Sequence, residues 1–281
     1  MEERKMIYDP QIINIKDIIK SKTSKKVPLF LIDFLQKIIH QDEINQILTQ
    51  HKDKTGVEFM SAALADFQIK TSIFGLENIS KNQRLIFASN HPLGALEALA
   101  LGKHLGRFFD GNINFITNEL LTHLNPLKEI FTSVKVGEKH QNKASIEMLD
   151  NIFRSDKQIL MFPSGVVSRK IKNRVQDPEW KKMFVTKARQ YQRDVVPVFC
   201  SGRNSNFFLN FSKFRKFLGI KTNIELMFLP NEMFKNKKSE IRITIGKPIS
   251  YRTFTTEKSD FEWANAVREM VYQLTELTQF S

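Results

Sequence analysis

Residues 85–97, Leu-Ile-Phe-Ala-Ser-Asn-His-Pro-Leu-Gly-Ala-Leu-Glu, decide the fold, because an unbroken apolar run gives way to a turn and then to a helical pattern. The run at residues 85–89 predicts a strand that is buried on both faces. The helical pattern continues to residue 108. A buried strand followed directly by a helix is typical of α/β folds.

The same pattern recurs along the chain. Apolar runs at residues 112–117, 158–162 and 194–199 predict three more strands, and helical patterns lie at residues 143–154 and 179–192. Two later apolar runs, at residues 224–229 and 240–246, continue the strand pattern, and residues 260–280 predict a final amphipathic helix. Alternation of this kind predicts an α/β fold with a mostly parallel sheet flanked by helices.

The N-terminal part has a different pattern of apolar residues. From residue 9 to about residue 70, isoleucine and leucine recur at helical spacing and predict two or three amphipathic helices. We therefore expect an N-terminal helical region over residues 1–73 and an α/β domain over residues 74–281. The isoleucine stripes favour packing on a core, although nearby lysines such as Lys20 and Lys22 leave a bilayer interface open.

Composition limits the possible partners and the compartment. Of the 281 residues, 41% are hydrophobic, which is typical of a globular chain, and 43 Lys and Arg against 30 Asp and Glu give a net charge of +13. That excess favours an anionic partner: nucleic acid, an acidic membrane or a phosphorylated substrate. The single cysteine, Cys200, excludes an intrachain disulfide and indicates a reducing compartment. We find no signal-peptide pattern and no apolar stretch of about 18 residues, so any membrane contact is expected to be peripheral.

His91 and Glu97 are the candidate catalytic pair. His91 follows the first strand of the α/β part, and ligands of open α/β sheets bind at the carboxyl ends of strands. If His91 lies in the turn and Glu97 in the first helical turns, the carboxylate can accept the Nδ1 proton and leave Nε2 as a general base. The alternative is a strand-capping histidine and a solvated acid that favours the helix dipole.

Two more strand ends carry candidate residues. The segment Phe162-Pro163-Ser164-Gly165 forms a predicted tight turn, and it precedes Ser168, Arg169 and a basic run. Residues 168–193 hold nine Lys or Arg against two acids, which could bind a phosphate or be an ordinary solvated face. In the last strand end, Pro197 predicts a sheet edge, a bulge or a deliberate turn.

In this order the three segments resemble the glycerolipid acyltransferase superfamily of the lysophosphatidate type, over roughly residues 75–250. They are similar above all to a hemolysin-like bacterial branch whose first motif reads Asn-His-Pro-Leu-Gly-Gly-Leu-Asp. The matching positions are Asn90, His91 and Glu97 in the first motif, Phe162, Pro163, Gly165, Ser168 and Arg169 in the third, and Pro197 with its flanking valines in the fourth.

The chain also departs from the general motifs. Five residues instead of four separate His91 from its carboxylate, which is Glu97 instead of Asp. Position 164 is Ser where the general motif has an acceptor-binding Glu, and residues 118–126 contain no convincing match to the middle, phosphate-binding motif.

The resemblance implies an O-acyltransferase of membrane lipid synthesis that moves a fatty acyl chain from acyl-CoA or acyl carrier protein to a lysolipid, either lysophosphatidate or a lyso-aminolipid. His91 is expected to take the hydroxyl proton and Glu97 to fix its tautomer. Backbone donors near Ser164 and Gly165 are expected to stabilise the oxyanion, and Arg169 to bind an anionic group. Neither a metal nor a cofactor is expected. An anionic membrane surface is the expected partner, with the enzyme bound peripherally to the inner face of the cytoplasmic membrane.

Two other functions stay open. A catalytically idle lipid-binding scaffold of the same fold is one, because fold does not guarantee chemistry. A nucleic-acid-binding protein that uses the basic loop and the Phe-rich segment 207–217 is the other. The second has no recognised nucleic-acid motif and leaves the His91 turn without a role, so no nucleic acid is expected.

Overall fold

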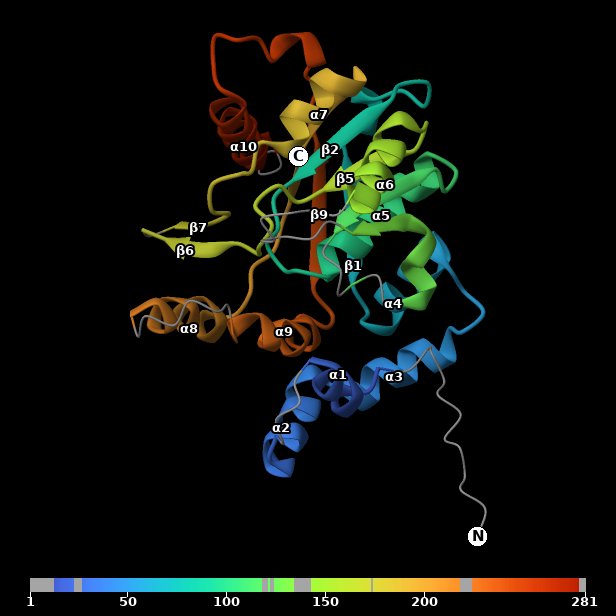
Figure 1. Cartoon of the computed structure of the whole chain (residues 1–281), viewed down its shortest axis with the longest axis vertical. Coiled ribbons are helices and arrows are strands. Elements are labelled where there is room, and N and C mark those ends of the chain that lie inside the picture. Colours follow the sequence, from blue (N-terminus) through green and yellow to red (C-terminus); the bar gives the residue numbers. More distant parts are fainter. Residues whose placement is uncertain are drawn as a thin grey trace.

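The computed structural model describes residues 13–22, 27–117, 121, 124–133, 143–172, 174–217 and 224–277. The chain begins with four helices, where the sequence predicted two or three (Figure 1). They are α1 (Ile15–Lys22), α2 (Leu29–Ile39), α3 (Gln41–Gln50) and α4 (Gly56–Asp66).

A seven-stranded sheet forms the centre of the molecule. Its strands are β1 (Lys70–Phe74), β2 (Leu85–Ser89), β3 (Ile113–Thr117), β4 (Phe131–Ser133), β5 (Gln158–Met161), β8 (Asp194–Cys200) and β9 (Glu240–Ile245). The order is β1-β9-β8-β2-β5-β3-β4, and all neighbours pair in parallel except β8 and β9. The predicted α/β fold with a mostly parallel sheet is therefore confirmed.

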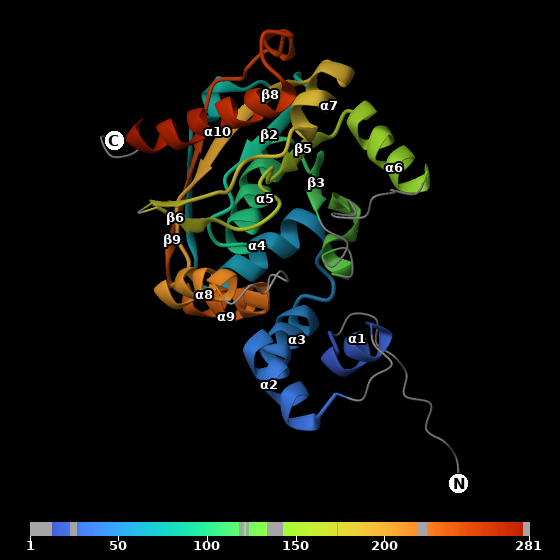
Figure 2. The same cartoon turned by 60° about the vertical axis from the view of Figure 1, so that its left-hand side comes forward.

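Helices cover both faces of this sheet, as Figure 2 shows. The covering helices are α4 and α5 (Leu96–Phe108) on one face, and α6 (Lys143–Arg154), α7 (Met183–Tyr191) and α10 (Asp260–Leu277) on the other. Along β2, Leu85 and Phe87 join the first core, and Ile86 and Ala88 join the second. The unbroken apolar sequence of this strand follows from that double burial.

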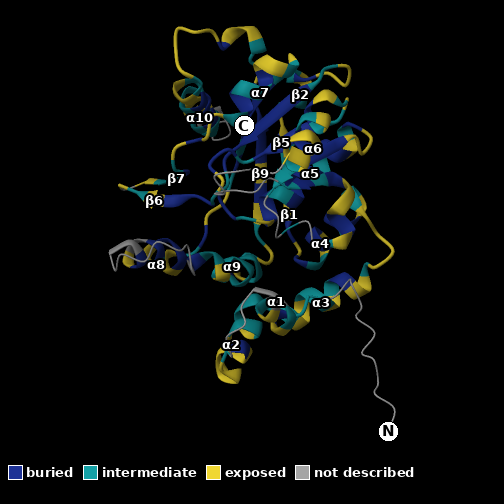
Figure 3. Cartoon of the chain, in the orientation of Figure 1, coloured by how far each residue is buried: buried dark blue, intermediate teal, exposed yellow. Residues whose placement is uncertain are grey.

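The order of the central strands positions the site. Since β8, β2 and β5 are neighbours and run parallel, their carboxyl ends at Cys200, Ser89 and Met161 lie along one edge of the sheet. Figure 3 shows these strands as the most deeply buried part of the fold. The three strand ends with candidate residues are therefore brought together as the sequence predicted.

Short elements surround this edge. After β5 comes an antiparallel hairpin of β6 (Arg169–Ile171) and β7 (Arg174–Gln176), and β8 is followed by α8 (Asn206–Phe217), η4 (Ile224–Phe228) and α9 (Leu229–Lys235). The other 3₁₀ turns are η1 (Leu76–Asn78), η3 (Asn125–Ile130) and η5 (Tyr251–Thr253). The strand pattern expected at residues 224–229 is wrong, because a short apolar run does not distinguish a buried helical turn from a strand.

The N-terminal helices differ in how far they join the core. Phe59 and Met60 of α4 lie in the same apolar core as α5, and β1, which starts before residue 74, pairs with β9. By contrast, α2 packs against α9 and η4 and keeps an apolar side open to solvent. Leu29 is 69% exposed, Phe30 75% and Phe34 52%. Part of α2 is accordingly coloured as exposed in Figure 3.

Candidate active site

The turn between β2 and α5 is held by backbone geometry and by one buried amide. Gly94 has a φ of +103°, in the region that favours glycine. Asn90 donates its side-chain N–H to the Cys200 carbonyl at 2.9 Å and accepts the Cys200 N–H at 2.7 Å. The predicted site residue Asn90 thus ties the end of β2 to the end of β8, directly before His91.

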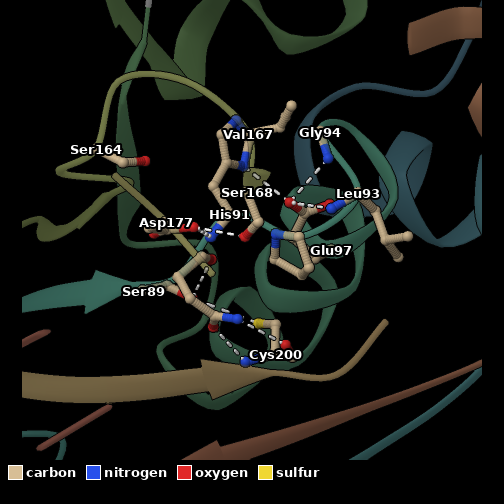
Figure 4. A network of polar contacts seen from close by, with 12 residues as sticks. Ser89, His91, Leu93, Gly94, Glu97, Ser164, Val167, Ser168, Asp177 and Cys200 are labelled. Atoms are coloured by element: carbon tan, nitrogen blue, oxygen red, sulfur yellow. Dashed lines mark hydrogen bonds and ion pairs between the residues drawn. The ribbon is translucent and has the colours of Figure 1, made fainter. Parts of the chain in front are cut away.

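His91 and Glu97 are in contact, as the sequence predicted. His91 Nδ1 lies 2.8 Å from Glu97 Oε1, and that oxygen also accepts the backbone N–H groups of Leu93 at 3.1 Å and Gly94 at 2.9 Å (Figure 4). Glu97 is fully buried, so the alternative of a solvated first-turn acid is wrong. Its carboxylate orients the imidazole and satisfies two N–H groups before the helix.

The imidazole of His91 is partly open to solvent, with 18% of its side chain exposed. Its ring stacks on Phe162 with centroids 4.2 Å apart and planes 19° from parallel. With the Nδ1 proton donated to Glu97, Nε2 carries the lone pair, and within the described part of the chain it makes no hydrogen bond. The arrangement can therefore take a proton from a hydroxyl group that approaches Nε2.

A second carboxylate, which sequence reasoning missed, holds the backbone of His91. Asp177 Oδ1 accepts the His91 N–H at 3.1 Å and the Ser168 hydroxyl at 2.6 Å, and Asp177 Oδ2 accepts the Trp180 indole N–H at 2.9 Å. Burial raises the pKa of Asp177, whereas these hydrogen bonds lower it. Its signal in the sequence is weak: an aspartate before a proline at the end of a basic run.

The turn after β5 contacts the His91 segment directly. The N–H of Ser168 donates to the His91 carbonyl at 2.6 Å. Gly165, at φ +67°, donates its N–H to the Phe162 carbonyl at 3.0 Å, and the Ser164 hydroxyl donates to the Val166 carbonyl at 2.7 Å. These donors close the turn itself, so the expected donation from Gly165 to an oxyanion does not agree with this structure. Pro163 is buried, and its carbonyl accepts the Lys181 N–H.

Arg169 is buried in an ion pair and is not open to an anionic group as the sequence predicted. Its side chain is 6% exposed, and Nη2 lies 3.1 Å from Glu225 Oε1. The same carboxylate binds Arg215 Nε at 2.7 Å through its other oxygen, and the Arg169 guanidinium lies over the Phe208 ring. Burial lowers the pKa of Arg169, and Glu225 raises it. The guanidinium is drawn inward because an acid from η4 offers a buried partner, so Arg169 joins β6 to α8 and η4.

Pro197 lies at an irregularity of the sheet, one of the places that the sequence predicted: Val198 pairs with Ile245, whereas Val195 bridges Ile249, so the register shifts by one residue. Pro197 is buried inside β8, a central strand, opposite Ala88 of β2. The strand tolerates it where the ladder to β9 ends, because β9 stops at Ile245 and Gly246 then donates its N–H to the Pro197 carbonyl at 2.9 Å. Pro197 therefore shapes the sheet next to the site.

The basic run of residues 168–193 does not form one continuous face. Arg169 and Arg193 are buried, and Arg193 donates to carbonyls of Phe153 and Lys157, next to the start of β5. Lys187 and Arg189 pair with acids of α6 and α10. Six of the nine cations are exposed: Lys170, Lys172, Arg174, Lys181, Lys182 and the paired Arg189.

The Phe-rich segment expected to stack bases in the nucleic-acid alternative is α8. Phe208 and Leu209 of this helix pack with Val167, and Arg215 is buried with Glu225. Packing thus accounts for much of the basic and aromatic pattern. In the described part of the chain, no three His, Cys, Asp or Glu side chains are arranged to hold a metal ion. The expectation of a reaction without metal or cofactor stays a prediction.

Comparison with known proteins adds a family and close relatives. Residues 18–279 match a protein family described as acyltransferase. The lyso-glycine lipid O-acyltransferase of Bacteroides thetaiotaomicron is 41% identical over 94% of this chain and 97% of its own length. The protein of that name from Phocaeicola vulgatus is 42% identical over 94% and 95%. A crystal structure of the 1-acyl-sn-glycerophosphate (LPA) acyltransferase, PlsC, from Thermotoga maritima is 15% identical, with a TM-score of 0.46 over 89% of this chain and 92% of that one.

Proposed function

This chain belongs to the acyltransferase family, and from its His91–Glu97 pair we propose that it transfers a fatty acyl chain from an acyl thioester to the hydroxyl of a lysolipid. The single observation that carries the chemistry is the 2.8 Å contact that holds His91 Nδ1 and leaves Nε2 as the base. The same contact favours an enzyme over an idle scaffold of this fold, because a buried acid aimed at an imidazole is not needed for lipid binding.

The reaction is a direct transfer. Nε2 of His91 takes the proton of the acceptor hydroxyl while that oxygen bonds to the thioester carbonyl carbon. The tetrahedral intermediate then breaks its carbon–sulfur bond, and His91 returns the proton to the departing thiolate. Glu97 stabilises the imidazolium that exists between these two steps.

For the acceptor we propose a lyso-aminolipid of the lyso-glycine lipid type. Two relatives with 41% and 42% identity over nearly the whole chain have names that include this substrate. Ser164, which replaces the acidic residue expected from the general acyltransferase motif, fits an acceptor other than lysophosphatidate.

The donor is proposed to be a thioester of coenzyme A or of acyl carrier protein, both of which are anionic. The exposed cations after the site turn support this docking, since Lys181 lies across Gly165: a Cβ at that glycine would come within 2.9 Å of Lys181 Nζ. Lys170, Lys172, Arg174 and Lys182 are exposed on the same stretch of chain. Cations there can attract the phosphates of the donor or the acidic side chains of a carrier.

We also propose that the enzyme works on an anionic membrane, at the inner face of the cytoplasmic membrane. No helix within the described ranges has the length and apolar character needed to cross a bilayer. The open apolar side of α2 supports contact with a membrane surface, and the net charge of +13 favours anionic lipids. Because α2 packs on α9, whose Leu229 lies beside Gly94, this surface is joined to the His91 turn.

The test is an acyl-transfer assay with purified protein, a lyso-glycine lipid and either acyl-CoA or acyl carrier protein loaded with the same chain, with the product identified by mass. His91→Gln is expected to lower the rate by at least about 10²-fold, because it removes the general base. His104→Gln is the matched control. His104 lies on α5 with its Nε2 bound to Thr71 at 2.9 Å, and its removal is expected to leave the rate unchanged.

Each part of the proposal has its own contrary outcome. Near-normal transfer by His91→Gln contradicts the mechanism. A higher kcat/KM with lysophosphatidate than with lyso-glycine lipid contradicts the acceptor. The ratio of rates with the two donors decides between coenzyme A and the carrier protein.

A further inference from the structure

Asp177, which lies between β7 and α7, is held by hydrogen bonds from several parts of the chain. Its carboxylate accepts from the His91 N–H, the Ser168 hydroxyl and the Trp180 indole, and the residue is fully buried. Helix α10 fixes its backbone: the Asp177 N–H donates to Tyr272 Oη at 2.7 Å, and Arg268 Nη2 donates to its carbonyl at 2.6 Å. Asp177 is therefore a rigid point between β7, α7 and α10.

This rigid point fixes His91 from a side that Glu97 does not reach. The His91 N–H is held by Asp177, and the His91 carbonyl accepts the N–H of Ser168, whose hydroxyl binds the same Asp177 oxygen. Of the atoms of His91, only the ring nitrogen Nδ1 is bound by Glu97. Ring and backbone of the base are thus positioned by two different carboxylates (Figure 4).

The charge of Asp177 is not cancelled by a direct ion pair. Arg268 binds its backbone carbonyl, and no Lys or Arg of the described chain lies within ion-pair distance of the Asp177 carboxylate. Burial raises the pKa of Asp177, and the two N–H groups, which can only donate, oppose that shift and favour the ionised form. The charge of Asp177 raises the pKa of three other groups, Arg169 on β6, Cys200 at the end of β8 and Tyr272 on α10, and Arg268 of α10 binds the Asp177 carbonyl.

We propose that Asp177 is a second positioning residue for the catalytic base: it holds the backbone of His91, and its uncompensated negative charge stabilises the imidazolium that forms during transfer. The proposal rests on the proposed function, in which His91 is the base. It extends that function by adding a residue 86 positions away that does not touch the substrate.

The test variant is Asp177→Asn, which keeps the size and removes the charge. Whichever way the new amide turns, its NH₂ faces an N–H group that the carboxylate now accepts. The matched control is Glu232→Gln. Glu232 is also fully buried and accepts a backbone N–H and a hydroxyl, both from Ser205, at 2.6 and 2.8 Å, but it does not contact His91.

Two measurements separate positioning from a merely structural role. In steady-state kinetics, Asp177→Asn is expected to lower kcat about tenfold with little change in KM, and Glu232→Gln to leave both unchanged. In ¹⁵N-histidine NMR titrations, with the His91 signal identified by its loss in His91→Gln, Asp177→Asn is expected to move the His91 midpoint to lower pH, because a nearby negative charge is removed. Glu232→Gln is expected not to move it.

Equal changes in both variants, or an unmoved His91 midpoint in Asp177→Asn, overturn the proposal. The NMR titration needs no substrate, so it decides the role of Asp177 even where the transfer assay contradicts the proposed function. If Asp177→Asn does not fold, Ser168→Ala takes its place. Loss of one donor raises the pKa of Asp177, so the pH below which kcat falls is expected to move upward, and an unchanged pH profile overturns the proposal.

Discussion

At the scale of single residues, the length of the Glu97 side chain sets the geometry of the pair. A single oxygen, Oε1, receives the His91 ring and two backbone N–H groups at distances of 2.8 to 3.1 Å. These three contacts depend on how far the Glu side chain reaches into the turn.

Glu97 provides a test of charge against reach. Glu97→Gln keeps an oxygen for the two N–H groups but removes the charge and puts an NH₂ where Oε2 has no partner among the described residues. We expect kcat to fall about 10²-fold. Glu97→Asp keeps the charge but withdraws the carboxylate by about 1.5 Å, so it too is expected to lose activity. Full activity of Glu97→Asp, measured in the same transfer assay, contradicts this dependence on the reach of the side chain.

The sequence predicted those site residues whose roles depend on neighbours in the chain. His91 and Glu97 are six positions apart, so one turn brings them together. Asp177 and the inward turn of Arg169 could not be predicted, because both depend on partners from other elements: His91 is 86 positions from Asp177, and Glu225 is 56 positions from Arg169. The position of a cation within a basic run does not show whether its side chain turns inward or toward solvent.

At the scale of elements, one buried carboxylate joins three short segments. Glu225 of η4 binds Arg169 of β6 at 3.1 Å and Arg215 of α8 at 2.7 Å. None of these elements belongs to the central sheet, and Val167 with Phe208 forms a small apolar core beneath them. The position of β6, α8 and η4 next to the His91 turn is therefore stabilised by this charged cluster as well as by apolar packing.

Glu225→Gln tests that dependence. Two buried guanidinium groups would lose the carboxylate between them, and breaking a buried pair in this way costs about 3–5 kcal/mol. We expect the melting temperature to fall by about 10 °C in thermal unfolding monitored by circular dichroism. Lys81→Gln is the control, since its pair with Asp110 is exposed and a change there is expected to be small. A melting temperature equal to that of the unmodified protein contradicts the structural role of the cluster.

The same dependence on distant partners limited the prediction of helices and strands. The strands at β2, β3, β5 and β8 were predicted because both of their faces are buried, which leaves an unbroken apolar run. The hairpin of β6 and β7 was missed, because its strands have three residues each and are rich in cations. The apolar run at residues 224–229 was assigned to the wrong kind of element, since Glu225 inside it is buried by its partners and not by strand pairing.

At the scale of the whole molecule, the exposed apolar side chains and the positive charge favour one orientation of the protein on a membrane. Helix α2 and helix α10 lie toward opposite ends of the molecule (Figure 1). The exposed apolar side chains of α2 are Leu29, Phe30, Leu31 and Phe34, and those of α10 are Phe261 and Met270. The charge of +13 acts over the whole surface. We expect α2 to make the apolar contact with a membrane and the cations to strengthen it.

Flotation with anionic vesicles tests this orientation. The double variant Phe30→Ser, Phe34→Ser is expected to bind about tenfold or more weakly, because each exposed Phe loses part of its burial in lipid. Phe261→Ser on α10 is the matched control and is expected to bind normally. Added salt is expected to weaken binding of the unmodified protein through screening. Binding that neither the double variant nor salt changes contradicts a peripheral contact through α2.

The hold of α10 on Asp177 has a consequence in time. His91 leaves the ribosome early, whereas Arg268 and Tyr272 follow about 180 residues later, roughly 10 to 35 s at usual rates of synthesis. Until then Asp177 has its contacts with His91, Ser168 and Trp180 but lacks those with α10. The last part of the site to be assembled during synthesis is therefore the support that α10 gives to the backbone of Asp177.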